Sequence, residues 1–236
     1  MYSFTLEHTP AEIVTIFPKA SDLFKANNIN FCCQGDQTLH TVLQEKEMDE
    51  SVLLEELNQR FNRWKDAGEE RITWETMPLS AIVDYITEKY HHFLDEELSP
   101  LEQFVTRVFH VHGEDHPHLM ELYDLYIDFK TGAEEHLIKE ENELFPLIKE
   151  YDESPTHELA THIQETITGF EKAHENEIAV LKQIREVTDA FEPPAGACNT
   201  YRITYSRLAE LEENTMQHVH VENNVLLKRL REIIAS

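Results

Sequence analysis

The amino-acid sequence predicts an all-α protein, in which a small helical domain is followed by a four-helix, up-down bundle. Apolar residues recur at steps of three and four along the chain, and no stretch alternates between apolar and polar residues as a half-buried strand does. The 236 residues include only 6 glycines, which suits helices with few tight turns. Four long helical patterns joined by short connections are typical of an up-down bundle.

Residues 1–65 are expected to form the small domain from short helices. The stretch TPAE at residues 9–12 combines a capping box with proline at the first helical position, so a helix should begin there. A second helix is expected over residues 19–26. Thr38 and Asp49 can each cap a further helix through a side-chain oxygen, and the last of these helices should run almost to the end of the domain.

Residues 66–77 are polar and show no sustained period, which is typical of a linker. The bundle is then expected to occupy residues 78–236. Its breaks fall at stretches that contain glycine and proline, which end helices. The four long helices are expected at about residues 79–108, 117–151, 155–191 and 200–235.

The chain is strongly acidic, with 20 Lys and Arg against 46 Asp and Glu and a net charge of −26. Such a charge should repel nucleic acid and anionic membranes, but it suits cations and basic protein partners. No apolar run approaches the roughly 20 residues of a membrane span, and the first residues lack the pattern of a signal peptide. Three cysteines, two of them adjacent, do not form a disulfide framework, so a reducing cytoplasm is expected.

Each expected bundle helix carries one histidine on its apolar face. The assignment follows from the three- and four-residue steps that place side chains on one side of a helix. His92 and His220 share their faces with charged and polar residues, so they are not candidates for a buried site. The four candidates are His91, His136, His174 and His218.

Two of these helices repeat one motif. HLIKEENELF begins at His136 and HVHVENNVLL begins at His218, and a glutamate follows each histidine by four residues, Glu140 in the first and Glu222 in the second. This spacing places histidine and glutamate one turn apart on the same side of a helix. The histidines of the first and third helices are 83 residues apart, and those of the second and fourth are 82 apart. The bundle is therefore expected to use one helix pair twice.

A lone histidine on an apolar face is more often a hydrogen-bonded core residue than a metal ligand, and most glutamates belong to solvated faces. Here the joint pattern favours a metal site, because a buried carboxylate is costly unless it is paired or bound to metal. Four neutral imidazoles and two carboxylates can hold two divalent ions, and the carboxylates can bridge them. These ligands suit iron, and also zinc or manganese.

With these motifs and the earlier YHH at residues 90–92, the bundle resembles hemerythrin-like di-iron domains. The stretch IFPKASDLFKANNINFCCQGDQTL resembles the cysteine-pair domain that precedes such bundles in the repair-of-iron-centres family, also called iron–sulfur cluster repair di-iron proteins. The resemblance covers nearly the whole chain. It implies two non-haem iron ions per chain, bridged by the two glutamates. The implied iron ligands are His91, His136, Glu140, His174, His218 and Glu222.

The chain departs from the family pattern at three places. Cys32-Cys33-Gln34-Gly35 stands where Cys-Cys-Gly-Gly is usual, and Ala173 stands where members often have glutamate before the third ligand histidine. The last motif ends in Leu226-Leu227 instead of Phe-Pro.

The resemblance implies a cytoplasmic stress-response protein that repairs iron–sulfur clusters damaged by oxidative or nitrosative stress, with the bundle as iron donor. Its partners would be damaged iron–sulfur proteins, with NO or O2 at the di-iron site; a homodimer is left open. The alternatives are a di-iron nitric oxide reductase, an oxygen or nitric oxide sensor, and an oxygen carrier. Whether the protein is an enzyme is also left open.

Cys32 and Cys33 are candidates for a redox or iron-relay role, because a disulfide between neighbours is strained and easily reduced. The alternative is two small residues at the rim of a little domain. Cys198 is expected to be a packing residue. The stretch HVHGEDHPH at residues 110–118 holds four histidines, and we expect a solvated connection between helices with none of the four as a ligand.

Overall fold

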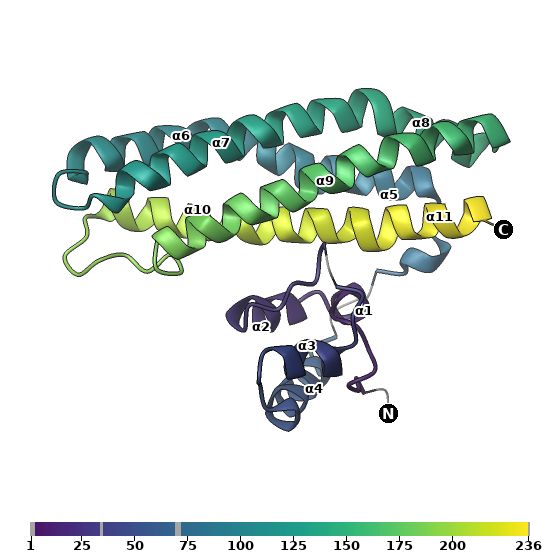
Figure 1. The fold of residues 1–236 in the computed structure, drawn as a ribbon, viewed down its shortest axis with the longest axis horizontal. Coiled ribbons are helices and arrows are strands. Elements are labelled where there is room, and N and C mark those ends of the chain that lie inside the picture. Colours follow the sequence, from purple (N-terminus) through teal and green to yellow (C-terminus); the bar gives the residue numbers. More distant parts are fainter. Residues whose placement is uncertain (1–2, 34, 69–71, 236) are drawn as a thin grey trace. The chain divides into compact units, whose positions relative to one another are not determined.

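The computed structural model describes residues 3–33, 35–68 and 72–235, and all regular structure in these ranges is helical (Figure 1). The prediction of an all-α protein is therefore confirmed. The chain divides into two compact units, Met1–Met77 together with Val219–Ser236, and Pro78–His218. Gln34 lies outside the described residues. Among the helices of the described ranges, none is long and apolar enough to span a bilayer.

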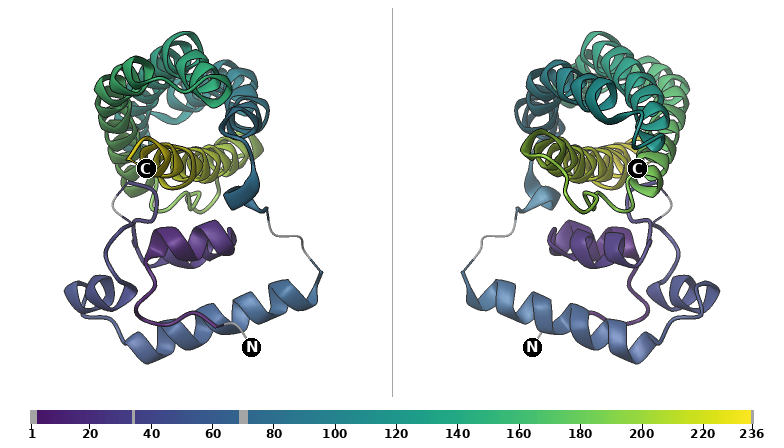
Figure 2. Two further views of the ribbon diagram at one scale, coloured as in Figure 1. Left: turned by 90° about the vertical axis from the view of Figure 1, so that its right-hand side faces the viewer. Right: turned by 90° about the vertical axis from the view of Figure 1, so that its left-hand side faces the viewer.

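The unit Pro78–His218 contains four helices arranged around a common axis (Figure 2). The first consists of α5 (Leu79–Ile86), the π-helical turn η2 (Thr87–His91) and α6 (His92–His112). The second consists of α7 (His118–Lys139), the π-helical turn η3 (Glu140–Leu144) and α8 (Phe145–Glu153). The third is α9 (His157–Val187), and the fourth is α10 (Asn199–Val221), which leaves this unit after His218.

The core of this unit is apolar and draws on all four helices. Leu101, Leu208 and Leu211 are essentially inaccessible to water, and burying each such side chain contributes about 2 kcal/mol. Tyr126 is also fully buried, and its hydroxyl donates to the carbonyl oxygen of Leu98 at 2.6 Å. This bond matches the rule that a buried hydroxyl needs a partner.

The third helix is shorter than predicted. Its helical pattern was expected to continue to Phe191, but the helix ends at Val187. Asp189, Ala190 and Phe191 all adopt left-handed backbone angles, with φ of 51°, 57° and 64°. This turn folds Phe191 back into the core, where the guanidinium of Arg185 lies 5.1 Å from the centre of its ring. Phe191 continues the apolar pattern of the third helix, but it belongs to the turn that follows the helix.

The other unit contains the N-terminal helices α1 (Pro10–Ile16), α2 (Ala20–Ala26), α3 (Leu39–Glu45) and α4 (Glu50–Asp66), the 3-10 turn η1 (Trp74–Thr76), and the C-terminal η4 (Glu222–Leu227) and α11 (Lys228–Ala235). The predicted capping box is present, because Thr9 and Glu12 bond reciprocally to each other's backbone. Thr38 and Asp49 cap their helices as expected. The structure groups Val219–Ser236 with these helices, and the division into 1–65, 66–77 and 78–236 stays a prediction.

Within this unit the cysteine loop is fastened to the C-terminal helical segment. The amide of Asn224 donates to the carbonyl oxygens of Cys32, at 2.9 Å, and of Phe31, at 3.3 Å. The amide of Asn223 donates to the Cys32 carbonyl at 3.3 Å. Two side-chain amides of one helix thus satisfy carbonyl groups that would be costly to bury without a partner.

His220 completes this contact as a neutral ring. The Thr15 hydroxyl donates to the carbonyl oxygen of Ala11 at 2.8 Å, and its oxygen lies 3.1 Å from His220 Nε2. His220 Nδ1 lies 3.2 Å from the Asn224 amide nitrogen and 3.3 Å from the Phe31 carbonyl oxygen. Burial lowers the pKa of His220 to about 4, against a smaller raising effect of the Phe31 carbonyl, so the ring is uncharged at neutral pH.

Gly35 is required by close packing in the same loop. A Cβ atom there would lie 2.6 Å from the Phe31 carbonyl oxygen and 2.9 Å from the Ala11 side chain. We expect Gly35→Ala to lower the free energy of unfolding by about 1–3 kcal/mol, as overpacking does. Urea unfolding followed by circular dichroism measures the change.

The matched control is Gly169→Ala. Gly169 is exposed in the middle of α9, and an added Cβ would meet nothing within 4 Å. Alanine has the higher helix propensity, so this variant should gain up to about 1 kcal/mol. Equal stability of the two variants would show that the cysteine loop yields easily and does not need glycine.

Candidate metal centre

The four predicted histidines converge inside the unit Pro78–His218, one from each helix. His91 ends η2, His136 lies on α7, His174 on α9 and His218 on α10. All four side chains are buried. They form two pairs, with ring centres 4.8 Å apart for His91 and His218 and 4.6 Å apart for His136 and His174. The apolar-face argument therefore identified side chains that meet.

Glu140 lies between the two histidine pairs and is 1% exposed. Its Oε1 is 2.9 Å from His136 Nε2 and 3.6 Å from His174 Nε2. Its other oxygen, Oε2, is 3.4 Å from His91 Nε2, and His91 Nε2 is itself 3.1 Å from His218 Nε2. Each carboxylate oxygen thus faces a different histidine pair.

The separations of these atoms suit metal ions. His91, Glu140 and His218 offer ligand atoms within 4.8 Å of one another, and so do His136, Glu140 and His174. A metal about 2.0–2.1 Å from each imidazole nitrogen holds neighbouring ligand nitrogens roughly 3 Å apart, close to the 3.1 Å between the Nε2 atoms of His91 and His218. Imidazole with carboxylate is a donor set for iron, zinc or manganese.

Glu222 follows His218 by one helical turn. The helix is unbroken at the junction, since Val221 has φ −65° and ψ −36°, and the Glu222 side chain is buried. Helix geometry turns residues four apart to the same side. The structure thus keeps the predicted His-x3-Glu motif on a continuous helix.

Three π-helical turns coincide with candidate ligands. The turn η2 ends at His91, η3 begins at Glu140 and η4 begins at Glu222. A π-turn inserts an extra residue into an α-helix, and such turns occur frequently at functional sites. Periodicity at 3.6 residues does not reveal them, so this feature was visible only in the structure.

Two further carboxylates orient the imidazoles of His91 and His136, and neither was predicted from the sequence. Glu141 Oε1 lies 2.8 Å from His91 Nδ1, and Glu177 Oε1 lies 2.7 Å from His136 Nδ1. A carboxylate on Nδ1 fixes the tautomer, leaving Nε2 as the metal-binding atom. Glu177 sits on the buried face of α9, three residues after His174, and that position was the available signal.

The carboxylates also set the charge of His136. Burial on its own would lower the pKa of this imidazole, but Glu140 and Glu177 outweigh burial and raise the pKa to about 9. Without metal, the ring is therefore protonated at neutral pH and balances part of the buried negative charge. Metal binding at Nε2 must displace that proton, so it is accompanied by proton release.

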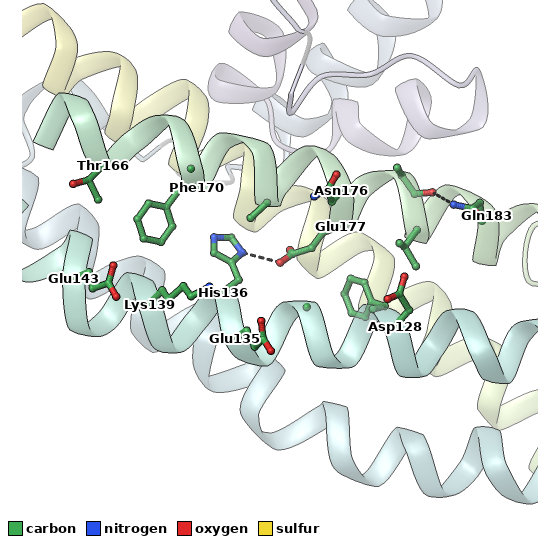
Figure 3. Close-up of a pocket in the computed structure, with 16 residues that line it drawn as sticks. Asp128, Glu135, His136, Lys139, Glu143, Thr166, Phe170, Asn176, Glu177 and Gln183 are labelled. Atoms are coloured by element: carbon green, nitrogen blue, oxygen red, sulfur yellow. Dashed lines mark hydrogen bonds and ion pairs between the residues drawn. The ribbon is translucent and has the colours of Figure 1, made fainter.

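A groove of about 960 Å³ between α7 and α9 reaches His136 and Glu177. Figure 3 shows these two side chains extending toward one another from neighbouring helices. Gly132 and Ala173 line the groove, and a Cβ added at Gly132 would meet nothing within 4 Å. Ala173 stands where members of the family often have glutamate, so a small side chain lines the groove at this position. The acidic side chains of the lining are Asp128, Glu135, Glu143 and Glu177, beside Lys139.

The other side chains discussed from the sequence lie elsewhere. His92 is 65% exposed, as predicted, whereas His220 is 2% exposed, contrary to its polar face, because it packs against the cysteine loop. Cys32 is 1% exposed and Cys33 is half-buried, with their sulfur atoms 3.9 Å apart. Cys198 was expected to be packed, but it is exposed, because it lies in the connection that precedes α10.

The comparisons with known proteins agree with this geometry. Residues 83–230 match the hemerythrin HHE cation binding domain, and residues 6–60 match the ScdA_N domain, described as a domain of unknown function. The iron-sulfur cluster repair protein ScdA of Staphylococcus haemolyticus (strain JCSC1435) is 34% identical over 225 residues, covering 95% of this chain and 98% of that protein. The iron-sulfur cluster repair protein YtfE of Enterobacter sp. (strain 638) is 32% identical over 218 residues, which cover 92% of this chain and 94% of that protein.

The fold and the buried His–Glu groups define a cation-binding bundle of the hemerythrin class. The chain belongs to the family whose members are named iron–sulfur cluster repair proteins. The resemblance found in the sequence is therefore confirmed.

Glu177 should matter for metal affinity because it orients His136 without reaching the metal. We expect Glu177→Gln to weaken metal binding about 10–100-fold, as is usual for such carboxylates. Competition with a chelator of known affinity measures the change. Glu175→Gln is the matched control, since Glu175 is exposed on the same helix. Equal affinity of both variants would exclude a positioning role for Glu177.

Proposed function

We propose that this protein repairs damaged iron–sulfur clusters and that its bundle supplies the iron. The observation that carries the proposal is the placement of Glu140, whose two oxygens face two separate histidine pairs. Such a carboxylate can hold two metal ions side by side. The names of the relatives supply the repair context.

We propose six ligands for two iron ions. His91 and His218 hold one ion, His136 and His174 hold the other, and Glu140 and Glu222 bridge them. The support for Glu222 is its burial and its place one turn after His218. Iron bound there would serve as the reservoir for a recipient cluster, with imidazole and carboxylate as its protein ligands.

Release of iron is compatible with this ligand set. Imidazole and carboxylate hold Fe(II) less tightly than the soft thiolates of a cluster-binding protein do. The groove beside His136 is lined by four carboxylates and one lysine, and an excess of acidic groups raises the local concentration of cations. Among the described residues that line the groove, Lys139 is the only lysine or arginine.

We propose Cys33 as the thiol that meets a partner and Cys32 as its buried neighbour. Cys32 donates its thiol proton toward Asn30 Oδ1 at 3.4 Å, and the same oxygen accepts from the backbone amides of Cys32 and Cys33. The Asn223 amide lies 4.0 Å from the Cys33 sulfur. The loop thus gives the inner thiol a hydrogen-bond acceptor and places an amide donor near the outer sulfur.

A second candidate function uses the same centre. The groove gives a small molecule a path to the His136 side of the bundle, which favours reduction or sensing of nitric oxide as the alternative. Stopped-flow mixing of the reduced, iron-loaded protein with NO separates them: catalytic turnover indicates a reductase, and stoichiometric binding indicates a sensor. A donor releases iron to an apo-cluster protein without consuming NO.

A cytoplasmic location and a homodimer remain predictions.

The ligand assignment predicts a graded loss of metal. Glu140→Ala should remove the magnetic coupling between the irons and most of the bound metal, because both positions share this carboxylate. His91→Ala should lose about one ion per chain, and His92→Ala should retain both. Iron analysis and Mössbauer spectroscopy on protein purified without oxygen measure these effects. Equal losses from His91→Ala and His92→Ala would contradict the assignment.

The cysteine proposal predicts a separation between metal content and repair. Cys32→Ser/Cys33→Ser should keep the di-iron spectrum but lose part of the reactivation of an NO-treated iron–sulfur dehydratase, because a thiolate pair can exchange with a partner. In the wild type, brief treatment with iodoacetamide should modify Cys33 before Cys32. Unchanged reactivation by the double variant would leave the cysteine pair a structural role only.

A further inference from the structure

One end of the unit Pro78–His218 gathers histidines and a cysteine that the sequence analysis treated separately. His112 is the last residue of α6, His116 lies in the loop that follows, and Cys198 directly precedes α10. The α6–α7 and α9–α10 connections lie at the same end of the bundle (Figure 1). His112 is 21 residues after His91 along one helix, so this cluster is about 30 Å from the predicted di-iron ligands.

Cys198 and His112 already stand at the separation of two ligands of one metal. The Cys198 sulfur lies 3.3 Å from His112 Nε2. Zinc binds thiolate at about 2.3 Å and imidazole at about 2.0–2.1 Å, so tetrahedral geometry places the two donor atoms roughly 3.6 Å apart. An ion can therefore enter between them with little movement.

His116 lies close to this pair, in the loop that follows α6. Its ring centre is 6.4 Å from that of His112, and its backbone N–H donates to the His112 carbonyl at 2.8 Å. The ring of Tyr201 lies 5.6 Å from His112 and 5.7 Å from His116, and so packs against both imidazoles. His116 stands in a loop and is partly exposed, and the site proposed below requires its side chain to turn toward the Cys198–His112 pair.

The other two histidines of this stretch have different roles. His118 Nε2 lies 3.0 Å from the hydroxyls of both Tyr201 and Tyr205. His118 is thus occupied by the two hydroxyls and lies beside Tyr201 under the cluster. His110 stacks on Phe109 with ring centres 5.5 Å apart.

We propose that His112, His116 and Cys198 form a second metal site, which binds zinc with one coordination position left to water. One thiolate and two imidazoles suit zinc, whereas calcium and magnesium require oxygen ligands. The Cys198 thiol loses its proton to solvent when the ion binds. The ion ties the α6–α7 loop to the start of α10.

The test uses the full-length, iron-loaded protein in the Cys32→Ser/Cys33→Ser background, where Cys198 is the remaining thiol among three cysteines. The probe is zinc, measured by metal analysis after gel filtration and by absorption spectroscopy at the zinc edge. We expect one zinc ion per chain with one sulfur ligand at about 2.3 Å. Cys198→Ser should remove the sulfur ligand, and His112→Ala should weaken binding at least 10-fold.

His110→Ala is the matched control, because it removes an imidazole from the same stretch without touching the cluster, and its zinc binding should equal that of the parent. Absence of retained zinc, or zinc bound by nitrogen and oxygen alone, would overturn the proposal. So would full zinc binding by Cys198→Ser. None of these measurements depends on cluster repair, so the result is independent of the function proposed above.

Discussion

The burial of Glu140 among four imidazoles is the constraint on which the rest of the bundle depends. A carboxylate that is 1% exposed is strongly unfavourable unless positive charge lies beside it. In the absence of metal, protonated His136 provides part of this charge; bound metal ions would provide it fully. Because each histidine comes from a different helix, bringing them around this charge requires each helix to turn its histidine toward the centre of the bundle. Metal binding and the fold of the bundle are therefore coupled.

The end of the ligand-bearing helix serves two purposes on two faces. Residues two apart on a helix point about 200° apart, so Glu222 faces away from His220 and Asn224. Asn224 donates to the backbone of the cysteine loop and His220 lies against the Thr15 hydroxyl, whereas Glu222 continues the His-x3-Glu motif. A change of the loop, such as oxidation of Cys32 and Cys33, would thus act on the same turn of helix that carries a proposed metal ligand.

The two proposed metal positions differ in their surroundings, although the sequence motif repeats. The carboxylate behind His91, from Glu141, is 47% exposed, whereas Glu177 behind His136 is 6% exposed. The groove lined by Gly132 and Ala173 opens on the His136 side. The repeat therefore supplies like side chains to both proposed positions. The residues behind them differ, so one position faces a groove and the other lies in front of a solvated carboxylate.

Much of the site could be predicted from local sequence patterns. The parts that depend on long-range contacts could not. The helices, their caps and the faces of His91, His136, His174 and His218 follow from periodicity and spacing, which a single sequence displays. The end of the third helix was misjudged because three left-handed residues lie beneath an apolar pattern.

The sequence by itself determined the all-α class, the doubled His-x3-Glu motif and the choice of candidate histidines, because each depends on residues within a turn or two of one another. Only the tertiary structure decided which oxygen of Glu140 faces which histidine pair, that Glu177 supports His136 from 41 residues away, and that Cys198 meets His112 across 86 residues. The physical reason is that these contacts depend on the register between packed helices and on loop conformation, which no periodicity within one helix encodes.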